Sequence, residues 1–236
     1  YHTRTRQACN IVYRKDEFRT MRQRSKEEVQ EAEQIKESVF DNLRESNALA
    51  MNEDLRFVSP KIFQIMKNIQ KFMKDGKPRG KILFYSDFRS DAGSEAFELA
   101  LRSNGYERFD TKNPQGGQGL RYTFITGSEP TDERRINKEH YNDDKNKYGE
   151  YIQIMIISSA GAEGLSLTCV RQVHIFEPYW NYVRIDQVLG RAIRMRSHNA
   201  LPKSERNVEQ YLYLSVLPPG TSIDGVFETV KNNPDW

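Results

Sequence analysis

The chain is poor in the features that mark secreted, metal-binding and membrane-spanning proteins. It has only two cysteines in 236 residues, and the separation of Cys9 from Cys169 offers neither a disulfide framework nor metal-ligand spacing. No stretch approaches the run of about 18 apolar residues that a membrane span needs, and no signal peptide is recognisable. We therefore expect a reducing, intracellular compartment and no membrane partner. The net charge of +3 permits nucleic-acid binding but does not argue for it.

The composition is that of a chain with one large domain and additional segments at its ends. Charged residues make up 29% and hydrophobic residues 37%, which leaves room for a real core. Residues 1–58 hold no proline or glycine, and their apolar residues recur at helical spacing, which predicts a helical extension. This extension is either a surface or bridging helix or a specialised basic arm. We expect the main domain at 59–220 and a tail at 221–236. Because the chain starts at Tyr1 and not at Met, we expect it to be cut from something longer.

Short apolar runs alternate with helical patterns along the main domain. Ser59 and Pro60 are typical of a helix start, and Asp75-Gly76 of its end. A second helix is expected over 92–103, and Thr131 is expected to cap a third. Strands are predicted at 82–85, 122–125, 152–157, 173–176 and 211–217. This alternation predicts an α/β fold with a parallel sheet covered on both faces.

The stretch 185–194 has two distinct faces when it is written as a helix. Ile185, Val188, Leu189 and Ala192 make an apolar stripe. The opposite side carries Gln187, Gly190, Arg191 and Arg194 at the same spacing. Arginine grips phosphate in a planar fork and keeps its charge. The pattern therefore predicts a helix that neutralises charge on a phosphate.

Two further segments follow predicted strands, at the edge where ligands of open parallel sheets bind. The first is 85–89, with the sequence YSDFR. The second is 158–167, whose small residues and two glycines, Gly161 and Gly164, let backbone N–H groups approach an anion closely.

Together these blocks resemble the superfamily-2 helicases. Gln187-x-x-Gly190-Arg191-x-x-Arg194 looks like their motif VI, 158–167 like motif V, and 84–88 like motif IV. The stretch 126–142 resembles the TG…R…FN stretch of the SWI/SNF-like branch. The likeness is greatest to helicases and nucleoside triphosphatases of nucleocytoplasmic large DNA viruses, in which the blocks YSxF, AEGxSL, RQVHIxEPYWN, GRAIRxxSH and LPxxER follow in this order. It covers about 59–217, and residues 7–10 resemble a segment that precedes this domain in the same group.

This resemblance implies a RecA-like three-layer domain, the second of two that share one ATP site. By family role, Arg194 is the arginine finger on the γ-phosphate, Arg191 is its neighbour, and Gln187 positions the phosphate or the attacking water. Gly164 and Ser166 face the nucleotide sugar or report its state, and Glu163 and Gly190 complete the expected nucleotide-binding set. The expected nucleic-acid contacts are Ser86, Asp87, Phe88, Arg89, Thr126, Gly127, Ser158, Ser159 and Gly161, with backbone groups holding phosphates of one strand and little sequence reading.

The chain has no G-x-x-x-x-G-K-[ST] loop and no acidic Mg²⁺ box. The resemblance therefore implies that ATP and Mg²⁺ are bound mainly by an N-terminal RecA-like domain outside this sequence, and that this fragment alone is inactive. Expected partners are that domain, DNA or RNA with DNA favoured, and viral transcription machinery. The implied setting is the host cytoplasm, in a viral factory, or the virion. The alternatives are a non-catalytic docking module of a transcription or packaging complex, and a double-strand translocase that does not unwind.

Several of these residues also have a purely structural interpretation. The two arginines could be salt-bridge partners, and the two glycines ordinary turn residues. Glu163 could cap its own loop or pair with the arginine helix. His174, on an apolar strand, is expected to be a core histidine with satisfied hydrogen bonds, and Tyr179 and Trp180 either stack on a base or pack under the arginine helix.

Overall fold

The computed structural model describes residues 9–11, 48–51, 53–89, 92–114, 120–162, 164–179, 181–216 and 220. Within these ranges a parallel sheet has the strand order β4-β5-β6-β3-β7-β8. Its strands are β3 (Lys81–Tyr85), β4 (Glu107–Arg108), β5 (Arg121–Ile125), β6 (Ile154–Ile157), β7 (Val170–Ile175) and β8 (Glu209–Leu212). A separate antiparallel hairpin pairs β1 (Met73–Lys74) with β2 (Lys77–Pro78).

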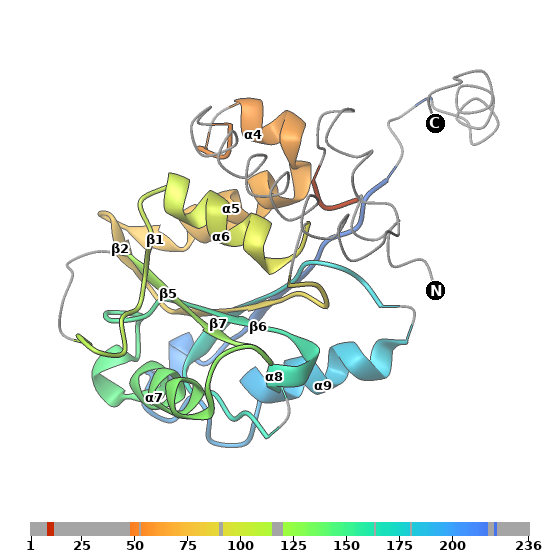
Figure 1. The fold of residues 1–236 in the computed structure, drawn as a ribbon. Coiled ribbons are helices and arrows are strands. Elements are labelled where there is room, and N and C mark those ends of the chain that lie inside the picture. Colours follow the sequence, from red (N-terminus) through yellow and green to blue (C-terminus); the bar gives the residue numbers. More distant parts are fainter. Residues whose placement is uncertain are drawn as a thin grey trace.

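Helices lie on both faces of the sheet (Figure 1). One face carries α4 (Glu53–Val58), α5 (Pro60–Lys71) and α6 (Ser94–Ser103). The other face carries α7 (Thr131–Asn142), the single turn α8 (Ser159–Ala162) and α9 (Tyr182–Ala192). Two short 3-10 turns, η2 (Asp144–Asn146) and η3 (Lys203–Glu205), complete the elements. This is the three-layer α/β arrangement that the sequence predicts.

Successive side chains along each strand point to opposite faces of the sheet, so each face has its own hydrophobic core. Ile82 and Phe84 of β3 belong to the core under α5 and α6, whereas Leu83 and Tyr85 belong to the core on the α7 and α9 side. Both faces of the central strands are covered, so β3, β5, β6 and β7 are buried along their whole length. This explains why β6 is a continuous apolar run in the sequence and why apolar residues prevail in β3.

The carboxyl ends of the strands are in register. Tyr85 lies beside Ile157 on one side and Ile175 on the other, and Ile125 and Leu212 continue the row outward. The segments that follow β3, β5, β6 and β7 therefore leave the sheet at one common edge. This edge brings together the motifs that are far apart in the sequence.

The predicted strands are confirmed, with shifted ends. β6 begins at Ile154 and β8 at Glu209, while β7 begins at Val170, ahead of the expected 173. The two-residue strand β4 was not predicted, because Glu107 and Arg108 are exposed and carry no apolar signal.

Two predicted helix boundaries are wrong. Asp75-Gly76 does not end α5, which stops at Lys71; both residues have positive φ, 51° and 71°, and form the turn of the β1–β2 hairpin. Thr131 is the first residue of α7, and the capping position is Pro130, without a side-chain hydrogen bond. In contrast, Ser59 caps α5 as predicted, since its Oγ accepts the Ile62 amide at 3.1 Å.

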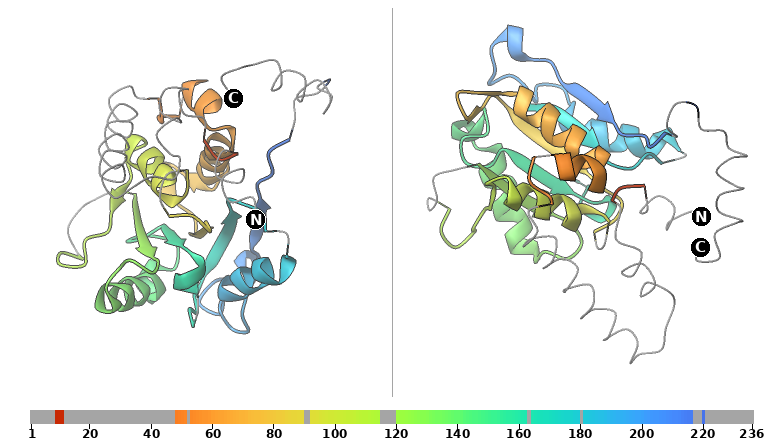
Figure 2. Two further views of the ribbon diagram at one scale, coloured as in Figure 1. Left: turned by 45° about the vertical axis from the view of Figure 1, so that its right-hand side comes forward. Right: turned by 90° about the horizontal axis from the view of Figure 1, so that it is seen from above.

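The described parts of the segment before residue 59 pack into the core of the main domain. Ile11, Leu49 and Leu55 are buried in the core under α5 and α6. Residues 9–11, red in both ribbon figures, lie beside the start of α5 (Figures 1 and 2). The rest of the expected helical extension, the segment 115–119 and the tail 221–236 lie outside the described residues. Among the described residues, no helix is long and apolar enough to cross a membrane.

Candidate functional site

The helix α9 presents two faces, as its sequence predicts. Ile185, Val188 and Ala192 are buried against the sheet, while Gln187 and Gly190 are exposed. The helix begins where the Asn181 side chain accepts the Val183 amide at 2.9 Å. Arg191 is half-buried, and its Nε is a buried donor with no hydrogen-bond partner. A Cβ built on Gly190 meets nothing within 4 Å. The surface at Gly190 is therefore open, and the neighbouring Arg191 keeps a buried donor that is not used within the described part of the protein.

Arg194 does not lie on this helix, contrary to the sequence prediction. The helix ends at Ala192 and the backbone turns at Ile193, whose φ and ψ are −108° and 86°. The Ser197 amide donates to the Arg194 carbonyl at 3.0 Å, and the Arg194 amide donates to Ser197 Oγ at 3.3 Å. Arg194 is thus held by a tight turn and not by helical hydrogen bonds.

His198 fixes that turn to the sheet. Its Nε2 lies 2.6 Å from the carbonyl oxygen of Val170, at the start of β7, and its Nδ1 lies 2.8 Å from Ser197 Oγ. A carbonyl can only accept, so Nε2 donates its N–H to Val170, and Nδ1 shares a hydrogen bond with the Ser197 hydroxyl. The sequence suggested no role for His198; the structure shows that it anchors the Arg194 turn.

The segment that follows β6 contacts α9 and the Arg194 turn. The amide of Leu167 donates to the carbonyl of Arg191 at 3.0 Å, and Arg194 Nη1 is hydrogen-bonded to Ser166 Oγ. Gly164 is exposed and has φ +67°, with open space around a built Cβ. The segment after β6, with Ser166, and the end of α9, with Arg191 and Arg194, therefore lie together on the α9 side of the sheet, toward the start of β7.

Gly161 is packed tightly against the end of β5. A Cβ at this position would lie 1.8 Å from the carbonyl oxygen of Ile125. On the neighbouring segment, Gly127 faces Ala160 with 3.4 Å between the built Cβ and the alanine Cβ. Gly161 is therefore required by packing, and it allows Ser158 and Ser159 to lie next to Thr126 and Gly127. Ser159 and Gly127 are exposed at the surface, whereas Thr126 is buried.

The loop after β3 is organised by a buried carboxylate. Glu177, which follows β7, is 1% exposed and accepts hydrogen bonds from Ser86 Oγ at 2.9 Å and from the Asp87 amide at 3.1 Å. Burial raises the pKa of Glu177 to about 7 despite these hydrogen bonds. Asp87 in turn accepts from Tyr85 Oη at 2.5 Å and pairs with Arg184 of α9 at 3.2 Å. The loop is thus connected to both β7 and α9.

A second buried carboxylate organises the neighbouring loop after β5. Glu129 accepts the Thr126 amide and hydroxyl, each at 2.6 Å, and pairs with Arg89 Nη1 at 2.8 Å. Burial alone would raise the pKa of Glu129, but the hydrogen bonds from Thr126 and Arg89 hold it below its ordinary value. Arg89 also donates to Thr126 Oγ1 at 2.6 Å. These contacts join the β3 and β5 loops.

These contacts correct part of the expected nucleic-acid surface. The amide of Ser86 donates to the Ile157 carbonyl, that of Asp87 to Glu177, and that of Phe88 to Ser86 Oγ. Ser86 itself is completely buried. Since these three amides are already used inside the protein, they are not free to hold phosphates. The predicted residues that leave polar groups at the surface of this edge are Gly127, Ser158 and Ser159, with Arg89 partly exposed and partly neutralised by Glu129.

Two expected residues lie outside the described part of the chain, Glu163 and Trp180. His174 is confirmed as a core histidine, since it is fully buried, is 2.7 Å from Tyr213 Oη, and has a pKa lowered to about 3 by burial. Tyr179 packs against Arg184 of α9, whose guanidinium carbon lies 4.3 Å from the ring centroid. This contact agrees with the interpretation of Tyr179 as a support of α9.

Sequence reasoning missed the two organising carboxylates, Glu129 and Glu177. Glu177 follows the buried run Val173-His174-Ile175-Phe176 and precedes Pro178. A charged residue at the end of a buried strand indicates that hydrogen-bond or ion-pair partners compensate for the burial of its charge. The partners themselves, Ser86, Asp87 and Asn10, are too distant in sequence to be inferred from it.

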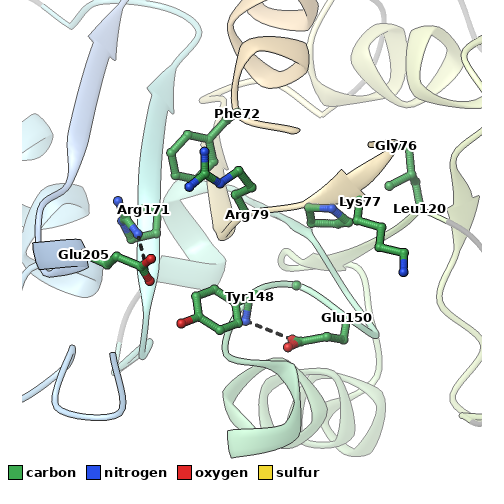
Figure 3. Close-up of a pocket in the computed structure, with 11 residues that line it drawn as sticks. Phe72, Gly76, Lys77, Arg79, Leu120, Tyr148, Glu150, Arg171 and Glu205 are labelled. Carbon is green, nitrogen blue, oxygen red and sulfur yellow. Dashed lines mark hydrogen bonds and ion pairs between the residues drawn. The ribbon is translucent and has the colours of Figure 1, made fainter. Parts of the chain in front are cut away.

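A separate pocket of ≈ 820 Å³ lies at the opposite, amino-terminal edge of the strands (Figure 3). Its lining is Phe72, Gly76, Lys77, Pro78, Arg79, Leu120, Tyr148, Gly149, Glu150, Arg171 and Glu205. Arg171 lies over the Phe72 ring, 5.3 Å from its centroid, and is held by Asn207 at 2.8 Å. None of the predicted site residues lines this pocket. Within the described ranges, no group of three or more His, Cys, Asp or Glu side chains is placed to hold a metal ion.

Several known proteins are similar to parts of the chain. A putative ATP-dependent RNA helicase, R350, of Acanthamoeba polyphaga mimivirus is 35% identical over 156 residues, which are 66% of this chain and 18% of that protein. The termination factor NPH-I homolog of African swine fever virus is 48% identical over 96 residues, 41% of this chain and 14% of that protein. The chain thus spans less than a fifth of the length of these relatives. The crystal structure of the C-terminal part of the Fun30 ATPase domain has a TM-score of 0.47 and 20% identity, over 68% of this chain and 42% of that chain.

The match to a protein family covers more than half of the chain. Residues 63–196 match the family described as helicase conserved C-terminal domain. This range runs from α5 to the turn after Arg194 and so includes every strand of the sheet edge described above except β8. The relatives are proteins of large DNA viruses, as the sequence resemblance predicted. The chain belongs to the helicase conserved C-terminal domain family.

Proposed function

We propose that the chain is the second motor domain of an ATP-dependent nucleic-acid helicase or translocase of a large DNA virus. In this proposal it supplies arginines to an ATP site shared with a domain outside this sequence. The observation that carries the proposal is the open face of α9. There Arg191 holds a buried donor without a partner, next to a glycine with nothing within 4 Å of its built Cβ.

The residues on this face fit a nucleotide phosphate. Arg191 and Arg194 would hold the β- and γ-phosphate oxygens, Gln187 would orient the phosphate or the attacking water, and Gly164 and Ser166 would lie toward the sugar. Bound ATP with Mg²⁺ supplies the phosphoryl group and the metal charge. The chain supplies positioning and positive charge, which for an arginine at a transferring phosphoryl group is worth roughly 10³–10⁵ in rate.

Nucleic acid would run across the carboxyl edge of the sheet. The groups at the surface there are the exposed Gly127 and Ser159 and the partly buried Ser158, with Arg89 beside them. Contacts of this kind position a strand without reading its bases, so we expect weak sequence preference. The relatives named above are a helicase and a termination factor, which favours a role in viral transcription.

The test is ATP hydrolysis by the full-length protein with and without DNA or RNA. The proposal expects stimulation by nucleic acid, and negligible hydrolysis by residues 1–236 alone because the P-loop is not in this sequence. Absence of stimulated hydrolysis in the full-length protein would favour the alternative of a non-catalytic docking module. Fork-unwinding and triplex-displacement assays would separate a helicase from a double-strand translocase.

A further inference from the structure

The residue with the most unusual surroundings outside the proposed phosphate site is Asn10. It is 1% exposed and lies 49 positions before the cap of α5, yet it is hydrogen-bonded to three separate parts of the domain. Its Nδ2 donates to Glu177 Oε1 at 2.6 Å and to the Ala92 carbonyl at 2.9 Å. Its Oδ1 accepts from Lys61 Nζ at 3.1 Å, and its carbonyl accepts from Ser59 Oγ at 2.5 Å.

These partners determine which way the Asn10 amide faces. A carboxylate and a carbonyl can only accept, and an ammonium group can only donate, so Nδ2 must face Glu177 and Oδ1 must face Lys61. The amide therefore bridges a buried cation and a buried anion. Lys61 itself is 7% exposed, and its Nζ also donates to the Phe176 carbonyl at 3.3 Å.

From Glu177 the connection continues into the proposed nucleic-acid loop. The same oxygen that accepts from Asn10 accepts from Ser86 Oγ, and the second oxygen accepts the Asp87 amide. Asp87 then pairs with Arg184 in the first turn of α9. An unbroken chain of hydrogen bonds therefore runs from the N-terminal segment, through Glu177 and the loop after β3, to the helix that carries Arg191.

We propose that Glu177 is a positioning residue that, through Asn10, makes the shape of the loop at 86–89 depend on the docking of the N-terminal segment. This inference rests on the proposed function, since the loop lies at the edge where nucleic acid would bind. Because the loop amides are used internally, Glu177 acts by holding the loop against the neighbouring Thr126 and Glu129 and not by touching a nucleic-acid strand. Undocking of residues 9–11 would release Glu177, and with it the loop and the first turn of α9.

The chemistry of the pair allows a polarity swap as a test. In Glu177→Gln a single amide oxygen replaces two carboxylate oxygens, so one N–H group must face either Asn10 Nδ2 or the Asp87 amide. In Asn10→Asp a carboxylate oxygen meets Glu177 Oε1 at the position now occupied by Nδ2. Either change removes a buried hydrogen bond and leaves like groups in contact.

Combining the two substitutions restores the pairing. The new amide N–H of Glu177→Gln can donate to the new carboxylate of Asn10→Asp, while its oxygen still accepts the Asp87 amide. The Ser86 hydroxyl can accept as well as donate, and Lys61 keeps an acceptor. The net charge of the pair is unchanged, and only the contact with the Ala92 carbonyl loses its donor.

The experiment uses the full-length protein at pH 8, above the pKa of Glu177. For wild type, both single variants and the double variant, it measures kcat, KM for ATP and the half-saturating concentration of a single-stranded oligonucleotide that stimulates hydrolysis. Each single variant is expected to raise the half-saturating concentration about tenfold, the effect of one lost buried hydrogen-bond partner, with KM for ATP little changed. The double variant is expected to return to within about threefold of wild type.

Asn146→Asp is the matched control. Asn146 is as buried as Asn10, and its side chain makes four hydrogen bonds, to Tyr141, Tyr151 and Ile152, against three for the Asn10 side chain, but it lies at the amino-terminal side of the sheet. The same amide-to-acid change there is expected to lower stability without changing the half-saturating oligonucleotide concentration. A merely structural role of Glu177 would give the same result as this control.

Hydrogen exchange of the same proteins distinguishes failure of this inference from failure of the proposed function. Peptides covering 86–89 are expected to exchange faster in each single variant and to regain protection in the double variant. If wild type shows no stimulation by nucleic acid, the proposed function fails, and the exchange data alone decide the positioning role. Two results would overturn the inference. In the first, the single variants behave like Asn146→Asp both in the half-saturating oligonucleotide concentration and in the exchange of 86–89. In the second, the double variant shows the sum of the two single defects.

Discussion

The amide of Leu167 donates a 3.0 Å hydrogen bond to the carbonyl of Arg191, in the last turn of α9. This bond joins the segment after β6 to the helix that carries the proposed phosphate-binding arginine. The hydrogen bond between Arg194 and Ser166 joins the same two stretches a second time. A change at one stretch is therefore expected to be felt at the other, which suits a site that must respond to bound nucleotide.

Gly190→Ala separates the phosphate-binding role of the α9 face from a structural role. Alanine inside a helix is more stable than glycine by about 0.5–1 kcal/mol, and the added Cβ meets nothing in this chain. We expect a more stable domain with reduced ATP hydrolysis in the full-length protein, because the methyl group occupies the face that phosphates approach. Thermal unfolding and steady-state kinetics check the two effects, and a stabilised variant with unchanged turnover would contradict the assignment.

His198→Ala tests the anchoring of the Arg194 turn. Loss of the hydrogen bonds to Val170 and Ser197 frees the turn without opening the main core, so we expect kcat to fall about tenfold or more while ATP affinity is kept. His140→Ala is the control, because His140 lies on α7 with its ring 5.2 Å from that of Phe109, away from the turn. Equal effects of the two substitutions would show that His198 does not act through Arg194.

Glu177 predicts a pH dependence of stability. Its pKa rises from the ordinary 4.5 to about 7 on folding, so the folded state binds more protons than the unfolded state between these values. The stabilisation of the folded state by the proton on Glu177 is present in full below about pH 4.5, and it is lost as the pH rises through about 7. The nearest titratable groups are Asp87, whose charge raises the pKa further, and Lys61 across Asn10.

The measurement compares urea unfolding of wild type and Glu177→Gln from pH 4.5 to pH 8. Glutamine cannot ionise, so only wild type loses stability through this position as the pH rises. Relative to Glu177→Gln, the unfolding free energy of wild type should fall by up to about 3 kcal/mol over this range. A difference that does not vary with pH would show that Glu177 is not held in the protonated form near neutrality.

Gly161→Ala tests how closely the segment after β6 is packed against β5. A Cβ would lie 1.8 Å from the Ile125 carbonyl oxygen, so the backbone at Gly161 and the backbone at the end of β5 would have to move apart. We expect destabilisation of about 3 kcal/mol or more, the upper end of overpacking effects. Gly127→Ala, where the nearest contact is 3.4 Å, is the matched control and should cost much less. Similar unfolding midpoints for the two variants would refute the packing argument.

The fold was largely predictable because its strands are buried on both faces. Runs such as 154–157 are wholly apolar, which is typical of a parallel strand that is covered on both faces. The two-residue strand β4 has exposed charged side chains, and its position depends on pairing with β5, which no local pattern encodes. Asp75-Gly76 fits a helix end and a hairpin turn equally well, because both use positive φ.

The candidate site was predictable only in part, for a different reason. Periodicity placed Gln187 and Arg191 on one face of α9, but it could not show that the helix stops at Ala192 and that Arg194 depends on Ser197 and His198. The buried hydrogen bonds of Glu177 join residues up to 167 positions apart. Such hydrogen bonds form only when the complete fold brings distant segments together, so the local sequence carries little information about them.

The most direct measurement is the effect of Arg194→Ala on the full-length protein, with ATP binding and nucleic-acid-stimulated hydrolysis measured on the same preparation. An arginine that stabilises a transferring phosphoryl group predicts a fall in kcat of about 10³-fold or more, with the Kd for ATP little changed. Turnover near that of wild type, or a loss explained entirely by weaker ATP binding, would contradict the account.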